Sequence, residues 1–236
     1  MHVHLPKPMH GWREFAGEVG IIVVGVLIAL GAEQVVETLH WRQQAKDAQA
    51  SLKTEIQDSV NSAAERQAVD DCLRRQLVDL RDSVTTADGG KALHLPSNEG
   101  RVISDLYATP WRAWARGVWE TAVASNVLDH VAADRLDGYA QIYKAIQDFD
   151  DIVRRERDAK GGLAPLSLGT LDKDKAGAVL GTLTNLDRDR ADILIASHDL
   201  REQAAKLGIR TNVPALKAKQ SFTVRYGVTV CQQRAI

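Results

Sequence analysis

Hydrophobic side chains form one block near the N-terminus, and polar and charged residues are interspersed with apolar ones in the rest of the chain. Residues 19–32 read VGIIVVGVLIALGA and contain no charged side chain. This run is shorter than the ~20 apolar residues of a typical membrane-spanning helix, but Trp12 and Trp41 flank it. In a helix these two residues are about 43 Å apart, close to the ~40–45 Å of a bilayer with its headgroup layers. Because tryptophan is enriched at membrane interfaces, we predict a membrane-spanning helix over residues 12–41, with Trp12 and Trp41 as interfacial anchors.

Two alternatives to a membrane anchor are a cleaved signal peptide and a buried helix of a soluble protein. A signal peptide needs a basic region before its apolar core and a cleavage site with small residues after it. The segment Ala29-Leu-Gly31 fits such a site, but Glu14 and Glu18 precede the core, where basic residues are expected. No Pro or Gly interrupts residues 33–84. We therefore favour an uncleaved anchor that continues as a helix.

Apolar residues after this block recur every three or four positions, which is the period of an amphipathic helix. The first stripe predicts one long rod over residues 40–84, with its apolar positions at Leu52, Ile56, Val60, Ala63, Leu73, Leu77, Leu80 and Val84. Residues 88–100 read as a loop because they begin with Asp-Gly-Gly and contain Pro96. Short helices are expected over residues 101–108 and 111–131, with Ser125-Asn126 as a turn or cap.

Two further long helices are predicted in the second half of the chain. The first covers residues 134–160 and is closed by Gly161-Gly162, before a loop over residues 163–170. The second begins at a cap, Thr170 or Asp172, and extends through Leu207 to Gly208. Residues 221–231 alternate apolar and polar side chains, which indicates a strand or an extended arm.

Together these patterns predict an all-α protein. A membrane-spanning helix continues into a long amphipathic helix, which packs in an up-down helical bundle with a short extended C-terminal tail. We expect a flexible tail over residues 1–11, the membrane helix over 12–41 and a helical extramembrane domain over 42–236. The chain has 44% hydrophobic and only 5% aromatic residues, a composition that suits helices better than sheets.

The N-terminal segment resembles a known group of proteins. Residues 12–34 (WREFAGEVGIIVVGVLIALGAEQ) and His40-Trp-Arg are similar to the start of a group of uncharacterised proteobacterial single-span membrane proteins. Residues 119–128 (WETAVASNVL) are similar to a second pattern of that group. The resemblance implies a single N-terminal span and a helical extramembrane domain, and it implies no activity.

The orientation in the membrane is not decided by basic residues, because their numbers on the two sides of the span are nearly equal. These residues are Lys7 and Arg13 before it, and Arg42, Lys46 and Lys53 after it. Short N-terminal tails before a first span usually stay in the cytoplasm. We expect a bacterial inner-membrane protein with a cytoplasmic N-terminus and a periplasmic domain.

The two cysteines, Cys72 and Cys231, have two interpretations. Free cysteines are commonly small buried hydrophobic residues, whereas an oxidising compartment permits a disulfide. A periplasmic domain would favour a Cys72–Cys231 bond. Neither residue has a second Cys or His at metal-binding spacing, so no metal site is predicted.

Other candidate residues favour structure over chemistry. Trp111, Trp114 and Trp119 are expected to form a packing cluster, because a net charge of −1 argues against a nucleic-acid surface. His2 and His4 are expected in a disordered tail, and His130 and His198 are single histidines on helices. The aspartate groups, Asp70-Asp71 and Asp148, Asp150 and Asp151, lack the glycine and terminal glutamate of a calcium loop. No catalytic or phosphate-binding motif is present, so we predict no catalytic residue, no cofactor and no enzyme activity.

The apolar block itself carries the remaining candidates. Glu18 and Glu33 lie near the two edges of the predicted hydrocarbon layer, where ionisable groups are functional candidates. Ala16 and Gly20, like Gly25 and Ala29, have the small-xxx-small spacing that lets membrane helices approach closely. We therefore expect a scaffold, accessory subunit or sensor that contacts the bilayer and a protein partner or a second copy. The alternatives are a subunit of a proton-driven complex that uses Glu18, and an enzyme of unidentified type.

Overall fold

The computed structural model describes residues 11–85, 106–110, 112–168 and 171–212, and this part of the chain is all-α. The predicted fold class is therefore confirmed, while the alternating segment over residues 221–231 lies outside the described residues. The elements are α1 (Trp12–Ala68), α2 (Asp70–Thr85), α4 (Gly117–Ala124), η1 (Val127–His130), α5 (Ala133–Ala159), η2 (Lys160–Leu168) and α6 (Lys173–Lys206).

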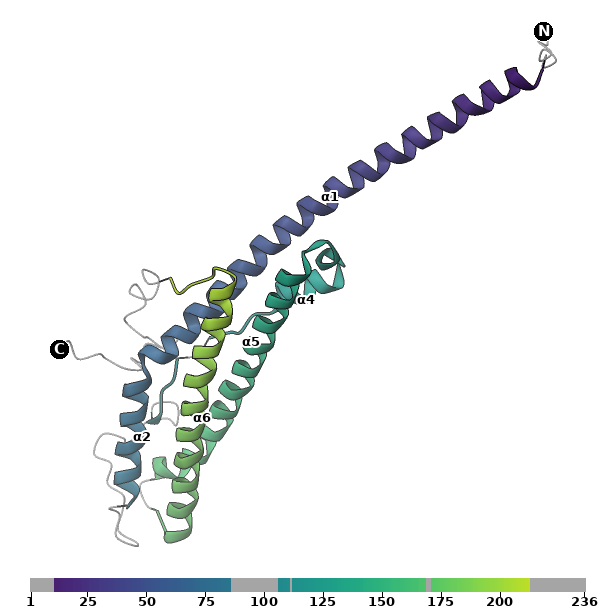
Figure 1. Cartoon of the computed structure of the whole chain (residues 1–236). Coiled ribbons are helices and arrows are strands. Elements are labelled where there is room, and N and C mark those ends of the chain that lie inside the picture. Colours follow the sequence, from purple (N-terminus) through teal and green to yellow (C-terminus); the bar gives the residue numbers. More distant parts are fainter. Residues whose placement is uncertain (1–10, 86–105, 111, 169–170, 213–236) are drawn as a thin grey trace, which may run out of the picture.

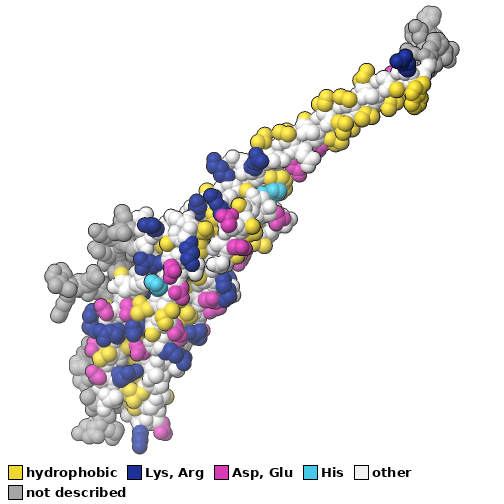
Figure 2. Space-filling view, in the orientation of Figure 1, with side chains coloured by type: hydrophobic (Ala, Val, Ile, Leu, Met, Phe, Trp, Pro, Cys, Tyr) yellow, Lys and Arg dark blue, Asp and Glu magenta, His cyan; other side chains and the backbone are white. Residues whose placement is uncertain are grey.

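Helix α1 has two halves with different surroundings. Its N-terminal half projects far beyond the bundle, and its C-terminal half packs beside α5 and α6 (Figure 1). The described side chains of residues 11–40 are exposed, and Trp41 is the first that is partly buried. Hydrophobic side chains cover the projecting half, whereas charged side chains are spread over the bundle (Figure 2). The apolar block is thus not buried as a core helix within the described part of this chain.

The long rod predicted over residues 40–84 is divided into two helices. α1 ends at Ala68, and Val69 adopts φ −99° and ψ 0° before α2 begins at Asp70. Asp70 and Asp71 then occupy the first turn of α2, where carboxylates interact favourably with the helix dipole. The prediction of one continuous rod was wrong because it relied on the absence of Pro and Gly, and neither is needed for this break.

The break separates two hydrophobic cores. One core lies between α1, α4, η1, α5 and the C-terminal part of α6, and it includes Leu52, Ile56, Tyr139, Ile146 and Phe149. The other lies between α2, η2 and the N-terminal part of α6, and it includes Leu73, Leu77, Leu163, Leu183 and Leu186. α6 contributes to both cores, so it acts as the common support of α1 and α2.

The connection from α5 to α6 is more regular than the loop predicted over residues 163–170. Lys160–Leu168 forms a 3-10 helix that continues directly from α5. A side-chain carbon added at Gly162 would collide with Thr182 of α6, so this glycine permits close packing of η2 on α6. The predicted cap of α6 is Asp172, which accepts a hydrogen bond from the backbone N–H of Lys175 at 2.8 Å.

The helix ends near Ser125-Asn126 and Gly208 agree with the sequence. Asn126, between α4 and η1, has the left-handed φ of 57°. Gly208 follows α6 with φ +76°, a conformation that glycine adopts without steric cost.

Candidate functional site

The projecting half of α1 places all four small residues of the predicted contact motifs on open surface. Side chains added at Gly20 or Gly25 would meet no atom within 4 Å, and Ala16 and Ala29 are exposed. Glu18 and Glu33 are exposed on the same helix. The structure therefore leaves this segment free to contact lipid or another helix.

The two small-residue pairs lie on opposite faces of α1. At about 100° per residue, Gly25 and Ala29 point about 180° away from Ala16 and Gly20. By the same count, the bundle-facing Leu52 falls on the Ala16 and Gly20 side. The Gly25 and Ala29 face thus continues along the side of α1 that points away from the bundle.

The two predicted interfacial anchors differ in their surroundings. Trp12 is 79% exposed. Trp41 instead stacks on His130 of η1, with ring centroids 4.4 Å apart and an interplanar angle of 18°. The end of the projecting segment is therefore also the first contact between α1 and the bundle.

A buried polar cluster lies beside the break between α1 and α2. Arg66 of α1 pairs with Glu156 of α5 at 2.6 Å, and both side chains are at most 3% exposed. The Tyr107 hydroxyl donates to the same Glu156 oxygen at 3.2 Å. Burial, followed by the nearby Glu156 charge, raises the pKa of Tyr107. Within the described residues, Arg66 Nε and Nη1 are buried and have no hydrogen-bond partner, so this part of the chain satisfies the guanidinium only in part.

Lys160 extends this cluster at the end of α5. Its ammonium lies 5.3 Å from the centre of the Tyr107 ring and donates to the Thr109 hydroxyl. Burial lowers the pKa of Lys160 to about 8, against the opposing effect of Glu156. The cluster therefore joins α1, α5 and the segment around Tyr107 through charges that are costly to separate.

A second buried carboxylate, Glu55, holds α4 against α1. It accepts hydrogen bonds from the backbone N–H groups of Val118 and Trp119, at 3.1 and 3.4 Å. It also accepts one from the Tyr143 hydroxyl at 2.7 Å, and burial together with this bond raises the pKa of Tyr143. Glu55, on another helix, thus accepts hydrogen bonds from N–H groups in the first turn of α4. The N-cap residue of α4, Arg116, makes no such side-chain hydrogen bond itself.

The predicted tryptophan packing cluster is present for the two members that the structure describes. Trp119 stacks on Tyr143 at 4.8 Å, and Trp114 contacts Phe149 at 4.2 Å. Trp111 lies outside the described residues. These rings cover the first core, and they are not arranged as an open stacking platform for a ligand.

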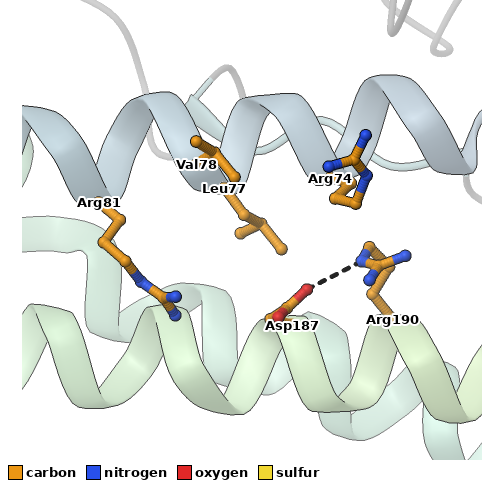
Figure 3. Close-up of a pocket in the computed structure, with 6 residues that line it drawn as sticks. All are labelled: Arg74, Leu77, Val78, Arg81, Asp187 and Arg190. Atoms are coloured by element: carbon orange, nitrogen blue, oxygen red, sulfur yellow. Dashed lines mark hydrogen bonds and ion pairs between the residues drawn. The ribbon is translucent and has the colours of Figure 1, made fainter.

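A pocket of about 230 Å³ lies between α2 and α6 (Figure 3). It is lined by Arg74, Leu77, Val78, Arg81, Asp187 and Arg190. Arg190 bonds to Asp187 at 3.0 Å and to Asp70 at 2.6 Å, while Arg81 reaches Thr184 at 3.5 Å. Two carboxylates already neutralise Arg190, and its ion pair with Asp70 joins α6 to α2. The charged side chains that line this pocket therefore serve mainly to hold the two helices together.

Those remaining candidates that the structure describes do not come together as a site. His198 lies 3.7 Å from Glu202 on the surface, and Asp150 pairs with Arg154. The described residues contain no group of three or more His, Cys, Asp or Glu that could hold a metal. Cys72 is not a free thiol. Cys231, like His2 and His4, lies outside the described residues, so the Cys72–Cys231 bond remains a prediction.

Comparisons with known proteins give no relative for this chain: no protein family, no curated protein and no solved structure matches it. The resemblance of residues 12–34 to a group of membrane proteins therefore remains an expectation. One helix, near the N-terminus, is long and apolar enough to cross a membrane among the described residues.

Sequence reasoning did not identify Glu55, Arg66 or Glu156 as important residues. Each occupies a position that is polar in the helical pattern, yet each is buried. One available signal was that Glu55 and Arg66 border the apolar stripe of α1, next to Ile56 and Ala63. Their partners lie 63 to 90 residues away, which local spacing does not reveal.

Proposed function

We propose that this protein is a membrane-anchored helical scaffold or accessory subunit that acts by contact with another membrane protein or with a second copy of itself. One observation carries the proposal: a fully exposed apolar segment and a packed helical bundle share one uninterrupted helix, α1. A helix exposed on all sides and apolar on all sides is stable in lipid, not in water. The rigid connection would transmit the position of the span to the bundle.

The face geometry favours partner contact at Gly25 and Ala29. Small residues let membrane helices approach closely enough for extensive van der Waals contact. A partner on that face would lie along the side of α1 that points away from the bundle. A partner on the Ala16 and Gly20 face would lie on the side where the bundle begins at Trp41.

A second candidate function is a subunit of a proton-driven membrane complex. Glu18 is exposed in the apolar helix and, at about 100° per residue, falls on the same face as Gly25 and Ala29. An acidic side chain at a helix–helix contact could bind a proton or a basic partner. The substitution Glu18→Gln separates the two candidates: it should abolish proton-linked activity of such a complex but leave partner contact by a scaffold intact.

Insertion and orientation are tested together on the full chain in bacterial membranes. We expect the protein to remain in the membrane after alkaline carbonate extraction, with peptides before Val19 still attached in mass spectrometry. A mature N-terminus near Ala32 or Glu33 would instead indicate a cleaved signal.

For a periplasmic domain, a fused reporter enzyme that works only outside the cytoplasm should be active. Non-reducing peptide mapping should then also link Cys72 to Cys231. An inactive reporter would contradict this orientation, and free thiols at both cysteines would contradict the bond.

A further inference from the structure

The bundle begins at Trp41, nine residues after the apolar block ends at Ala32. Leu39 is 58% exposed, and Trp41, two residues later, stacks on His130 of η1. Two residues of helix span about 3 Å. Each headgroup layer of a bilayer is roughly 5–7 Å thick, from the difference between total and hydrocarbon thickness. If α1 spans a membrane with Trp12 and Trp41 at its two surfaces, about 43 Å apart, η1 lies at the outer edge of the headgroup layer.

Helix α4 runs along α1 toward this end. Its first N–H groups, from Val118 and Trp119, bind Glu55, whereas the η1 segment that follows α4 reaches Trp41. Along α1, Glu55 and Trp41 are about 21 Å apart. The turn between α4 and η1 is thus carried to the side of the bundle from which α1 projects (Figure 1).

The surface at this turn is uncharged. Residues 121–128 read TAVASNVL, in a chain where 26% of residues are charged. We call its continuous exposed stretch, residues 123–126, the membrane-proximal turn. Val123 is 50% exposed, and the other three residues, Ala124, Ser125 and Asn126, are exposed as well. A small surface without charged side chains can lie against the headgroup layer without desolvating a charge.

The charged residues beside the turn indicate which lipids it fits. Exposed acidic residues, Glu120, Asp129 and Asp134, are accompanied by exposed basic residues, Arg135 on α5 and Arg42 beside Trp41 on α1. Because these charges nearly balance, this end of the bundle has little net charge with which to attract anionic lipids through their negative surface potential. The surface is therefore suited to zwitterionic headgroups, which carry no net charge.

We propose that the membrane-proximal turn contacts zwitterionic phospholipid headgroups, so that the bundle touches the bilayer at two places, α1 and this turn. Two contacts would fix the orientation of the bundle, which a single helix through the membrane leaves free to rotate or tilt. This inference rests on the proposed membrane insertion of α1.

The test is photo-crosslinking of the full chain in vesicles of phosphatidylethanolamine and phosphatidylcholine. A benzophenone amino acid replaces Val123, and the same probe at Leu30 reports insertion of the span. Ile195 and Val78 are matched controls, because both are exposed apolar residues, at 63% and 44%, on helices that lie away from the span. Lipid adducts are counted by mass spectrometry.

We expect lipid adducts at Leu30 and Val123, with at least fivefold lower yields at Ile195 and Val78. Adducts at Leu30 without adducts at Val123, or equal yields at Val123 and the two controls, would overturn the contact while leaving insertion intact. Crosslinks from Val123 to protein instead of lipid would also overturn it. Absence of adducts at Leu30 would overturn the proposed insertion, and the contact with it.

Discussion

Glu55 illustrates how single buried carboxylates organise this bundle. Three donors from α4 and α5 converge on it, so its removal leaves buried N–H and O–H groups without an acceptor. We expect Glu55→Ala to lower the free energy of unfolding by about 2–3 kcal/mol. Thermal or urea unfolding followed by circular dichroism measures this loss.

The matched control for this change is Asp58→Ala, one turn away on the exposed face of α1. We expect that change to stay within about 0.5 kcal/mol of the wild type, as surface substitutions usually do. Equal losses for both variants would show that Glu55 does not hold α4. Glu55→Gln keeps one acceptor oxygen, so its loss of unfolding free energy should fall between those of Glu55→Ala and Asp58→Ala.

The lowered pKa of Lys160 predicts that the stability of the protein rises with pH in the alkaline range. The pKa of Lys160 falls from 10.5 to about 8 in the folded protein, so between these values the unfolded state binds more protons. Stability therefore rises with pH through this window. From pH 8 to pH 10 the wild type should gain up to about 2 kcal/mol relative to Lys160→Met. The raised pKa values of Tyr107 and Tyr143 oppose the gain only above about pH 10.

The measurement is urea unfolding of both proteins at several pH values. A constant difference between Lys160→Met and the wild type across the window would contradict the lowered pKa. A rise in the wild type alone identifies Lys160 as its source, because the variant keeps every other titrating group.

Among the elements, α1 and α5 are joined by the buried pair Arg66–Glu156. Removing one partner of a buried pair leaves an uncompensated charge, which costs about 3–5 kcal/mol, whereas apolar replacement of both is far milder. We therefore expect Arg66→Met and Glu156→Leu each to be strongly destabilising. The double variant should be much less destabilised than the sum of the two, because the unpaired charge is gone.

A double-mutant cycle of unfolding free energies measures this coupling. Lys144 and Asp148, an exposed pair four residues apart on α5, provide the control cycle, with a coupling of about 0.5 kcal/mol or less. Additive losses in the Arg66–Glu156 cycle would contradict the coupling. The double variant should still be less stable than the wild type, because it also loses the hydrogen bond from the Tyr107 hydroxyl to Glu156.

The elements themselves were largely predictable, and their contacts were not. Helical periodicity located α5 and α6 within about one residue at each end, because both helices carry strong apolar stripes and α6 has a cap and a terminal glycine. The break at Val69 escaped prediction because nothing in its local sequence forbids a helix. It depends on packing of α1 and α2 against two different parts of α6, which is a tertiary effect.

The candidate site likewise has features that the sequence predicts and a contact that it does not. The apolar block, with its small residues and two glutamates, was visible in the sequence because composition alone distinguishes a segment suited to lipid. The Trp41–His130 stack was not predictable, because it joins residues 89 positions apart that only the packing of η1 on α1 brings together.

At the scale of the whole molecule, the exposed half of α1 predicts association through one face. If a second copy docks on the Gly25 and Ala29 face, Gly25→Leu with Ala29→Leu would separate the two helices by the bulk of the added side chains. We expect this double variant to weaken the dimer at least tenfold in mild detergent. Analytical ultracentrifugation, together with crosslinking in native membranes, measures the loss.

The opposite face provides a matched control. Ala16→Leu with Gly20→Leu adds similar bulk to the same helix, about 180° away, and keeps it equally apolar. This variant should associate like the wild type, because the side on which the bundle lies is not expected to meet a partner. If both variants weakened association equally, the contact would not be confined to one face. If the wild type were monomeric and purified without a bound membrane protein, the proposed mode of action would be wrong, since the small residues at Gly25 and Ala29 would then face only lipid.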